Sequence, residues 1–140
     1  MKNLFSVLIL SISFLTMQQA LAQEMNTNIN IIPNPKSIVI NEGTFRISSI
    51  TKLFYKKEAK QIAEYLNQIV NPSTGFDLTL NEWDGSVNEN SIILSLSNKA
   101  NDFGKEAYTL VVNKTNVLIE ASELNGLFYG VQTLRQLLPV

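Results

Sequence analysis

Two segments of the chain repeat apolar residues with the period of a helix. Between residues 57 and 70 the apolar positions recur at i, i+3 and i+4, and Asn71-Pro72 is expected to end the helix there. A second stripe begins near Ser122, a plausible N-cap, and is expected to end at Pro139. Its apolar positions are Leu124, Leu127, Phe128, Val131, Leu134 and Leu138. Because Gly126 and Gly130 each cost this helix about 1 kcal/mol relative to alanine, we expect another chain segment to approach closely there.

Short β-prone runs separated by turn residues surround these helices. Along residues 108–112 and 117–121 apolar residues alternate with period two, as in a hairpin with one buried face. The chain therefore predicts an α+β fold, a mostly antiparallel sheet of about seven strands with two helices packed on one face. The expected strands are 38–40 and 44–47, joined as a hairpin at Gly43, then 50–55, 76–80, 91–96, 108–112 and 117–121.

The first 22 residues have the pattern of a secretory signal peptide. Lys2 precedes an apolar run over residues 4–15, and Ala20-Leu21-Ala22 is a small-x-small cleavage site. A membrane span would need about 20 apolar residues, and this run is shorter. We therefore expect residues 1–22 to be a signal peptide, 23–30 a flexible lead-in and 31–140 the folded domain. The mature protein is expected to be exported to the periplasm or beyond, with no membrane association.

Composition restricts the chemistry that the chain can perform. Its 140 residues contain 11 Lys plus Arg against 12 Asp plus Glu, a net charge of -1, so a nucleic-acid partner is not expected. There is no Cys and no His, which removes thiolate chemistry, the commonest general base and the commonest metal ligand. We expect no metal, no cofactor and no catalytic residue.

Two motifs together point to a known family. Ile31-Ile32-Pro33-Asn34-Pro35 followed by Gly43-Thr44-Phe45-Arg46-Ile47 resembles the opening of family-20 glycoside hydrolases, the β-N-acetylhexosaminidases. The stretch at 106–110, the strand at 117–121 and the run from Gly126 to Pro139 (GLFYGVQTLRQLLP) are similar to the end of the same family's N-terminal domain. That resemblance implies a non-catalytic domain that packs against a following (β/α)₈ barrel.

The resemblance also implies where the chemistry is located. In the family an adjacent Asp-Glu pair of the barrel helps to hydrolyse terminal N-acetylhexosamine residues. No Asp stands next to a Glu here, and the chain ends at Val140, where the barrel would begin. We therefore interpret the chain as a fragment, the scaffold domain of an exported β-N-acetylhexosaminidase, and expect it to be inactive alone. N-acetylhexosamine-containing glycans would be bound by the barrel.

Few residues are candidates for a site. Trp83, in Glu82-Trp83-Asp84, is either a weak sugar contact or a loop tryptophan resting on the sheet. On the second helix, Tyr129, Gln132 and Gln136 lie off the apolar stripe and are candidates for docking on the barrel. Arg135 either pairs with a carboxylate of that domain or remains a solvated cation at the helix C-terminus.

Two other interpretations stay open. The chain is alternatively a stand-alone exported carbohydrate-binding or interaction module without catalysis, which contacts glycan through Trp83 or tyrosines. A third possibility is a similar N-terminal domain of another glycosidase, such as an α-glucuronidase or a family-84 enzyme. The GLFYG stretch followed by QTLRQLLP fits family 20 better.

Overall fold

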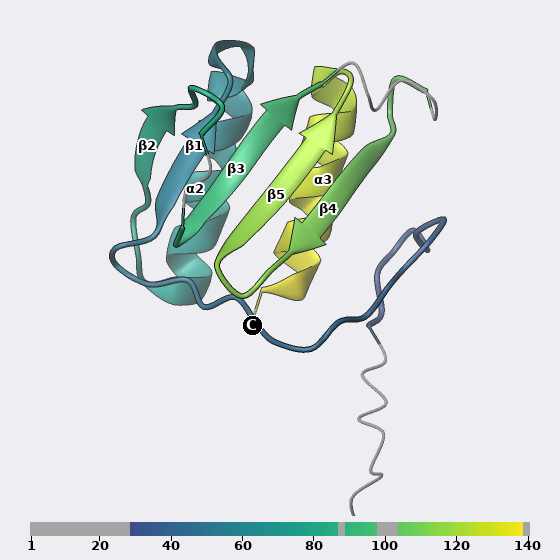
Figure 1. The fold of residues 1–140 in the computed structure, drawn as a ribbon, viewed down its shortest axis with the longest axis horizontal. Coiled ribbons are helices and arrows are strands. Elements are labelled where there is room, and N and C mark those ends of the chain that lie inside the picture. The colour runs from purple at the N-terminus through teal and green to yellow at the C-terminus, as the bar shows by residue number, and fades with distance from the viewer. Residues whose placement is uncertain (1–28, 87–88, 98–103, 139–140) are drawn as a thin grey trace, which may run out of the picture. The chain divides into compact units, whose positions relative to one another are not determined.

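A mixed β-sheet forms the centre of the fold (Figure 1). The structure is a computed structural model, which describes residues 29–86, 89–97 and 104–138. Within these residues it contains five strands, which lie in the order β2-β1-β3-β5-β4. Their bounds are β1 (Lys52–Tyr55), β2 (Thr79–Glu82), β3 (Ser91–Leu96), β4 (Tyr108–Val112) and β5 (Asn116–Ala121). Residues Ile31–Val140 belong to one contact unit, and the description below concerns that unit.

The strand directions differ from the sequence prediction. Strand β1 runs parallel to both β2 and β3, and β3 runs parallel to β5; the antiparallel pair of this sheet is β4 with β5. The predicted sheet of about seven mostly antiparallel strands is therefore wrong. Alternation of apolar residues reports which face a side chain takes and not the direction of its strand. Here a helix connects β1 to β2, and such a crossover joins parallel strands.

The hairpin formed by β4 and β5 confirms the period-two interpretation. Its turn is closed by the Asn113 N–H, which donates to the Asn116 carbonyl oxygen at 2.8 Å. Val117, Ile119 and Ala121 are all buried on the helix side of the sheet, as their alternation predicted. Strand β4 lies at the edge of the sheet, so its own alternating residues are less deeply buried than those of β5.

The first two predicted strands do not form. Residues 38–40 and 44–47 have no ladder partner among the described residues, and the side chain of Val39 is 78% exposed. Phe45 and Ile47 instead rest, half-buried, against the core cluster. A β-branched run favours extended backbone, but a strand also requires a neighbour to accept and donate its hydrogen bonds.

Two α-helices lie together on the same side of the sheet, behind it in Figure 1. They are α2 (Lys60–Thr74), preceded by the short 3₁₀ turn η1 (Lys57–Ala59), and α3 (Leu124–Leu137). Helix α2 continues through Pro72, which corrects the predicted end at Asn71-Pro72. It ends at Gly75, whose left-handed φ of 76° and N–H bond to the Asn71 carbonyl form the C-cap. Proline is tolerated because the carbonyl it leaves unbonded belongs to exposed Gln68.

The start of α3 also differs from the expectation. Glu123, and not Ser122, occupies the N-cap position, and its side chain makes no capping bond. The Ser122 hydroxyl is buried and has no hydrogen-bond partner among the residues that the structure describes. Because a side-chain oxygen caps only from the position that precedes the first turn, the shift by one residue removes the predicted cap.

The two glycines of α3 allow this helix to lie close to the sheet, and the expected close approach of another backbone is found at Gly126, whereas side chains lie against Gly130. A Cβ atom on Gly126 would overlap the backbone carbonyl oxygen of Ala107. One on Gly130 would overlap a methyl group of Ile119 and lie 3.2 Å from the Tyr108 ring. The core between sheet and helices is completed by buried side chains of both layers, among them Leu53, Leu66, Ile92, Leu94, Leu127 and Val131.

Candidate docking face and its pocket

Helix α3 exposes an unusual amount of apolar surface for a helix that packs on a sheet. Four large apolar side chains on it have exposed fractions of 39–43%. They are Leu124, Phe128, Tyr129 and Leu137. Single exposed apolar residues are common on protein surfaces, whereas several on one element mark an interaction site. We call the surface formed by Leu124, Phe128, Tyr129 and Gln132 the docking face, whereas Leu137, nine residues beyond Phe128, projects from the opposite side of the helix.

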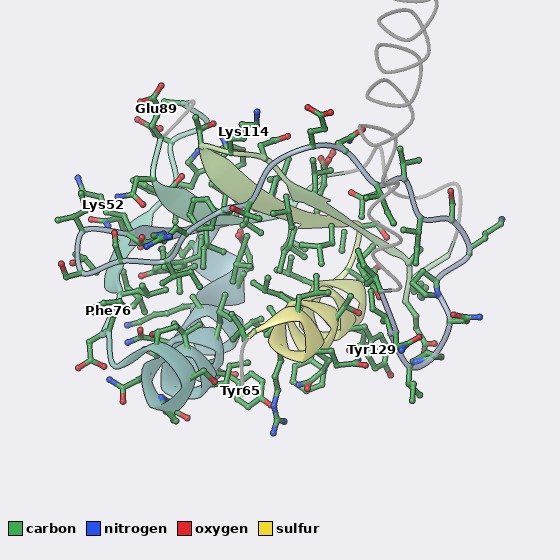
Figure 2. The ribbon with its side chains drawn as sticks, turned by 90° about the horizontal axis from the view of Figure 1, so that it is seen from below. Lys52, Tyr65, Phe76, Glu89, Lys114 and Tyr129 are labelled. Carbon is green, nitrogen blue, oxygen red and sulfur yellow. The ribbon has the colours of Figure 1, made fainter. Side chains whose placement is uncertain are left out.

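Aromatic contacts order the middle of the docking face. The rings of Tyr65 and Phe128 are tilted by 36° with centroids 5.5 Å apart, and those of Phe128 and Tyr129 are nearly edge-on at 6.1 Å. The Gln132 side-chain amide donates to the Tyr65 hydroxyl at 2.9 Å, which links α3 to α2. Figure 2 shows Tyr65 between the two helices and Tyr129 on the other flank of α3. These side chains therefore hold their positions in the absence of a partner.

A pocket of about 330 Å³ adjoins the docking face on the Tyr129 side. Three chain segments that are distant in sequence form it: the beginning of the folded unit, the start of β4 and the second half of α3. Its lining residues are Ile32, Pro33, Glu106, Tyr108, Tyr129, Gln132, Thr133 and Gln136.

Most polar groups in the pocket wall already have partners within the domain. The Gln136 side chain accepts from the Ile32 N–H at 2.9 Å and donates to the Ile32 carbonyl oxygen at 2.9 Å. The hydroxyl groups of Tyr108 and Thr133 are hydrogen-bonded to each other. The Glu106 carboxylate, in contrast, makes no hydrogen bond or ion pair within the part of the chain that the structure describes. Within the described residues, most polar groups of the pocket wall are therefore hydrogen-bonded, whereas the Glu106 carboxylate has no hydrogen bond or ion pair.

The structure brings together three of the four residues that the sequence suggested for docking. Tyr129, Gln132 and Gln136 line the pocket, whereas Arg135 is exposed in the last turn of α3 and does not line it. Sequence reasoning missed that Gln132 and Gln136 have partners inside the domain. It also missed Glu106, because nothing in a single sequence indicates that the start of β4 lies beside the second half of α3.

Trp83 lies in the loop after β2, and much of its polar and aromatic surface is engaged. The Lys56 ammonium lies 5.0 Å from the ring centroid, and the indole N–H donates to the Ser86 carbonyl at 2.7 Å. Hydrogen bonds from the Ser86 hydroxyl and N–H lower the pKa of the Asp84 carboxyl in the same loop. One ring face is thus covered by a cation, which leaves less surface for a sugar.

Neither metal chemistry nor membrane insertion is indicated by the described residues. In the ranges 29–86, 89–97 and 104–138 no three Asp, Glu, His or Cys side chains are grouped so that they could bind a metal ion. No helix in those ranges is both long and apolar enough to cross a bilayer.

The domain is a mixed sheet with two helices on one face, and helix α3 leaves several large apolar side chains exposed. Residues 28–140 match the family model described as glycosyl hydrolase family 20, domain 2. The chain belongs to this family. The resemblance seen in the sequence motifs is thereby confirmed.

Relatives of known identity agree with this assignment. The chain is 32% identical over 123 residues to a beta-hexosaminidase of Porphyromonas gingivalis, an alignment that covers 87% of the chain and 16% of the relative. Among solved structures, the family-20 β-N-acetylhexosaminidase of Streptomyces coelicolor A3(2) superposes with a TM-score of 0.66 at 34% identity, over 75% of this chain and 20% of that one. The Streptomyces plicatus N-acetyl-β-hexosaminidase, in complex with Thio-NAglucal, gives 0.65 at 33% identity, over 78% and 21%. The chain thus spans about a fifth or less of the length of these relatives.

Proposed function

We propose that this domain is the non-catalytic scaffold of an exported β-N-acetylhexosaminidase and that its docking face packs against a following (β/α)₈ barrel. The observation that carries the proposal is the docking face itself, on which the large apolar side chains of Leu124, Phe128 and Tyr129 are exposed on one helix. Removing such side chains from water would stabilise an interface by about 25 cal/mol per Å² of apolar area. The short span relative to the family-20 enzymes supports the presence of a much larger second domain in the parent protein.

In this proposal the chemistry belongs to the barrel, which binds N-acetylhexosamine-containing glycans and supplies the catalytic carboxylates. The domain contributes a rigid support, and Arg135, which lies in the last turn of α3, would pair with a carboxylate of the barrel. Residues 1–22 direct the protein to the periplasm or the extracellular space and are then removed. The chain alone is expected to release no nitrophenol from the nitrophenyl N-acetylglucosaminide.

Hydroxyl-radical footprinting tests the docking. Oxidation rates would be compared between the chain alone and a longer protein in which a family-20 barrel follows it. Tyr129 is 43% exposed in the chain and should become protected at least several-fold. Val111, on the sheet face opposite the helices, is 44% exposed and serves as the matched control, with an unchanged rate. Equal oxidation of Tyr129 in both proteins would refute the proposal.

The stand-alone carbohydrate-binding alternative has its own test. Trp83 is the one tryptophan of the sequence, so its fluorescence reports directly on this loop. The Lys56 ammonium over its ring argues against stacking on a sugar. Titration of the full chain with N-acetylglucosamine or chitobiose is expected to leave the fluorescence unchanged, and a saturable change would favour the binding module.

A further inference from the structure

We propose that the pocket beside α3 receives one basic side chain, with its apolar stem inside and its charge at Glu106, from the polypeptide that packs against the docking face. This inference rests on the proposed function, because it names the chemistry of the contact that the barrel would make.

The hydrogen bonds of the pocket argue for this occupant over a sugar. A pyranose needs several unpaired donors and acceptors around its hydroxyl groups. Here the Gln136 amide is bonded at both ends to Ile32, and the hydroxyl groups of Tyr108 and Thr133 bond to each other. Within the described residues, the polar groups of the wall that have no hydrogen bond are the Tyr129 hydroxyl, the Gln132 amide oxygen and the Glu106 carboxylate. The rest of the wall is the apolar surface of Ile32 and Pro33 and the Tyr129 ring. Such walls suit the methylene stem of a lysine or arginine.

The negative charge of Glu106 predicts that the side chain bound in the pocket is positively charged. None of the residues that line the pocket is a lysine or an arginine, and the Glu106 carboxylate has no partner within the described residues. Once a neighbouring domain covers the pocket, an unpaired carboxylate there would lose its hydration, and a cation removes that penalty. The Tyr129 ring adds a face on which a guanidinium or ammonium group is favoured.

The proposal is tested by NMR titration of the full chain with blocked tripeptides, acetyl-Gly-X-Gly-amide, in which X is arginine, lysine, norleucine or glutamate. Arginine and lysine peptides should shift the amide signals of Tyr129 and Gln132 saturably, with a dissociation constant in roughly the millimolar range. Norleucine should bind more weakly and glutamate not at all. E106Q should weaken arginine binding at least about threefold, and E123Q, which removes a carboxylate outside the pocket, should not.

Equal binding of norleucine and arginine, insensitivity to E106Q, or no saturable shift with any basic peptide would each overturn the proposal. So would saturable shifts at the same amides with N-acetylglucosamine. The titration needs no second domain, so its outcome is separate from the footprinting result. Basic-peptide binding without protection of Tyr129 in the longer protein would leave the pocket preference intact and refute the docking. Protection of Tyr129 without basic-peptide binding would support the docking and refute the pocket preference.

Discussion

The close contact between α3 and the sheet makes Gly126→Ala a sensitive test of the fold. The added Cβ would overlap the backbone carbonyl oxygen of Ala107 and lie 3.1 Å from the Ala121 Cβ. Ala107 directly precedes β4, and its backbone carbonyl oxygen cannot rotate away as a side-chain atom can, so the helix must move away from this segment. Overpacking of this kind costs about 1–3 kcal/mol. Alanine gains about 1 kcal/mol of helix propensity over glycine. The net expectation for G126A is a loss of up to roughly 2 kcal/mol.

Two other variants in the same helix serve as comparisons for the stability of G126A. In G130A the new Cβ would overlap the Cγ2 methyl group of buried Ile119 and approach the Tyr108 ring; both are side-chain atoms, and no backbone carbonyl would be displaced, so the loss should be smaller. Asn125 is exposed, and N125A should stabilise by about 0.5 kcal/mol through propensity alone. The expected order of stability is therefore N125A, wild type, G130A and then G126A.

Thermal and urea unfolding of the full chain, followed by far-UV circular dichroism, measures this order. For a domain of this size a loss of 1 kcal/mol lowers Tm by roughly 4 °C. An unchanged m value would show that the variants unfold from the same fold. If G126A proved as stable as N125A, helix α3 could not lie against Ala107 as the structure describes, and the reasoning about the glycines would be refuted.

Three further changes test individual contacts. Ser122→Ala should be neutral or stabilise by up to about 1 kcal/mol, because the buried hydroxyl has no hydrogen-bond partner among the described residues. If urea unfolding showed a loss of similar size instead, Ser122 would act as the N-cap after all. Gln136→Ala should speed amide exchange at Ile32 several-fold with little change in Tm, since both lost hydrogen bonds are exposed; unchanged exchange would contradict the bonds. The lowered pKa of Asp84 means that its stabilisation of the loop is complete above its ordinary value of 3.8 and is lost as pH falls through the lower folded value. Trp83 fluorescence should therefore change with acid in the wild type and not in D84N.

Local patterns determined much of what the structure contains. The apolar stripes of the two helices and the alternating apolar residues of β4 and β5 could be recognised in the sequence, because the periods of 3.6 and 2 residues follow from backbone geometry alone. The pair Gly126 and Gly130 indicated that another part of the chain lies close to the helix, since glycine is costly in a helix and is tolerated where a Cβ would not fit. The family, too, was recognisable from motifs that are continuous in the chain, and residues 28–140 match its model.

Tertiary structure alone decided which of the predicted runs became strands, and it alone formed the pocket. A β-branched run such as residues 38–40 is extended in either case, but only the arrangement of neighbours determines whether it becomes a strand. The parallel pairing of β1 with β2 was, in contrast, already indicated by the predicted order of strand 50–55, helix 57–70 and strand 76–80, because a helical crossover joins parallel strands, and the antiparallel prediction did not use this order. The pocket joins Ile32, Glu106 and Gln136, whose separation along the chain leaves no signal in a single sequence, because long-range proximity is a property of the packed layers.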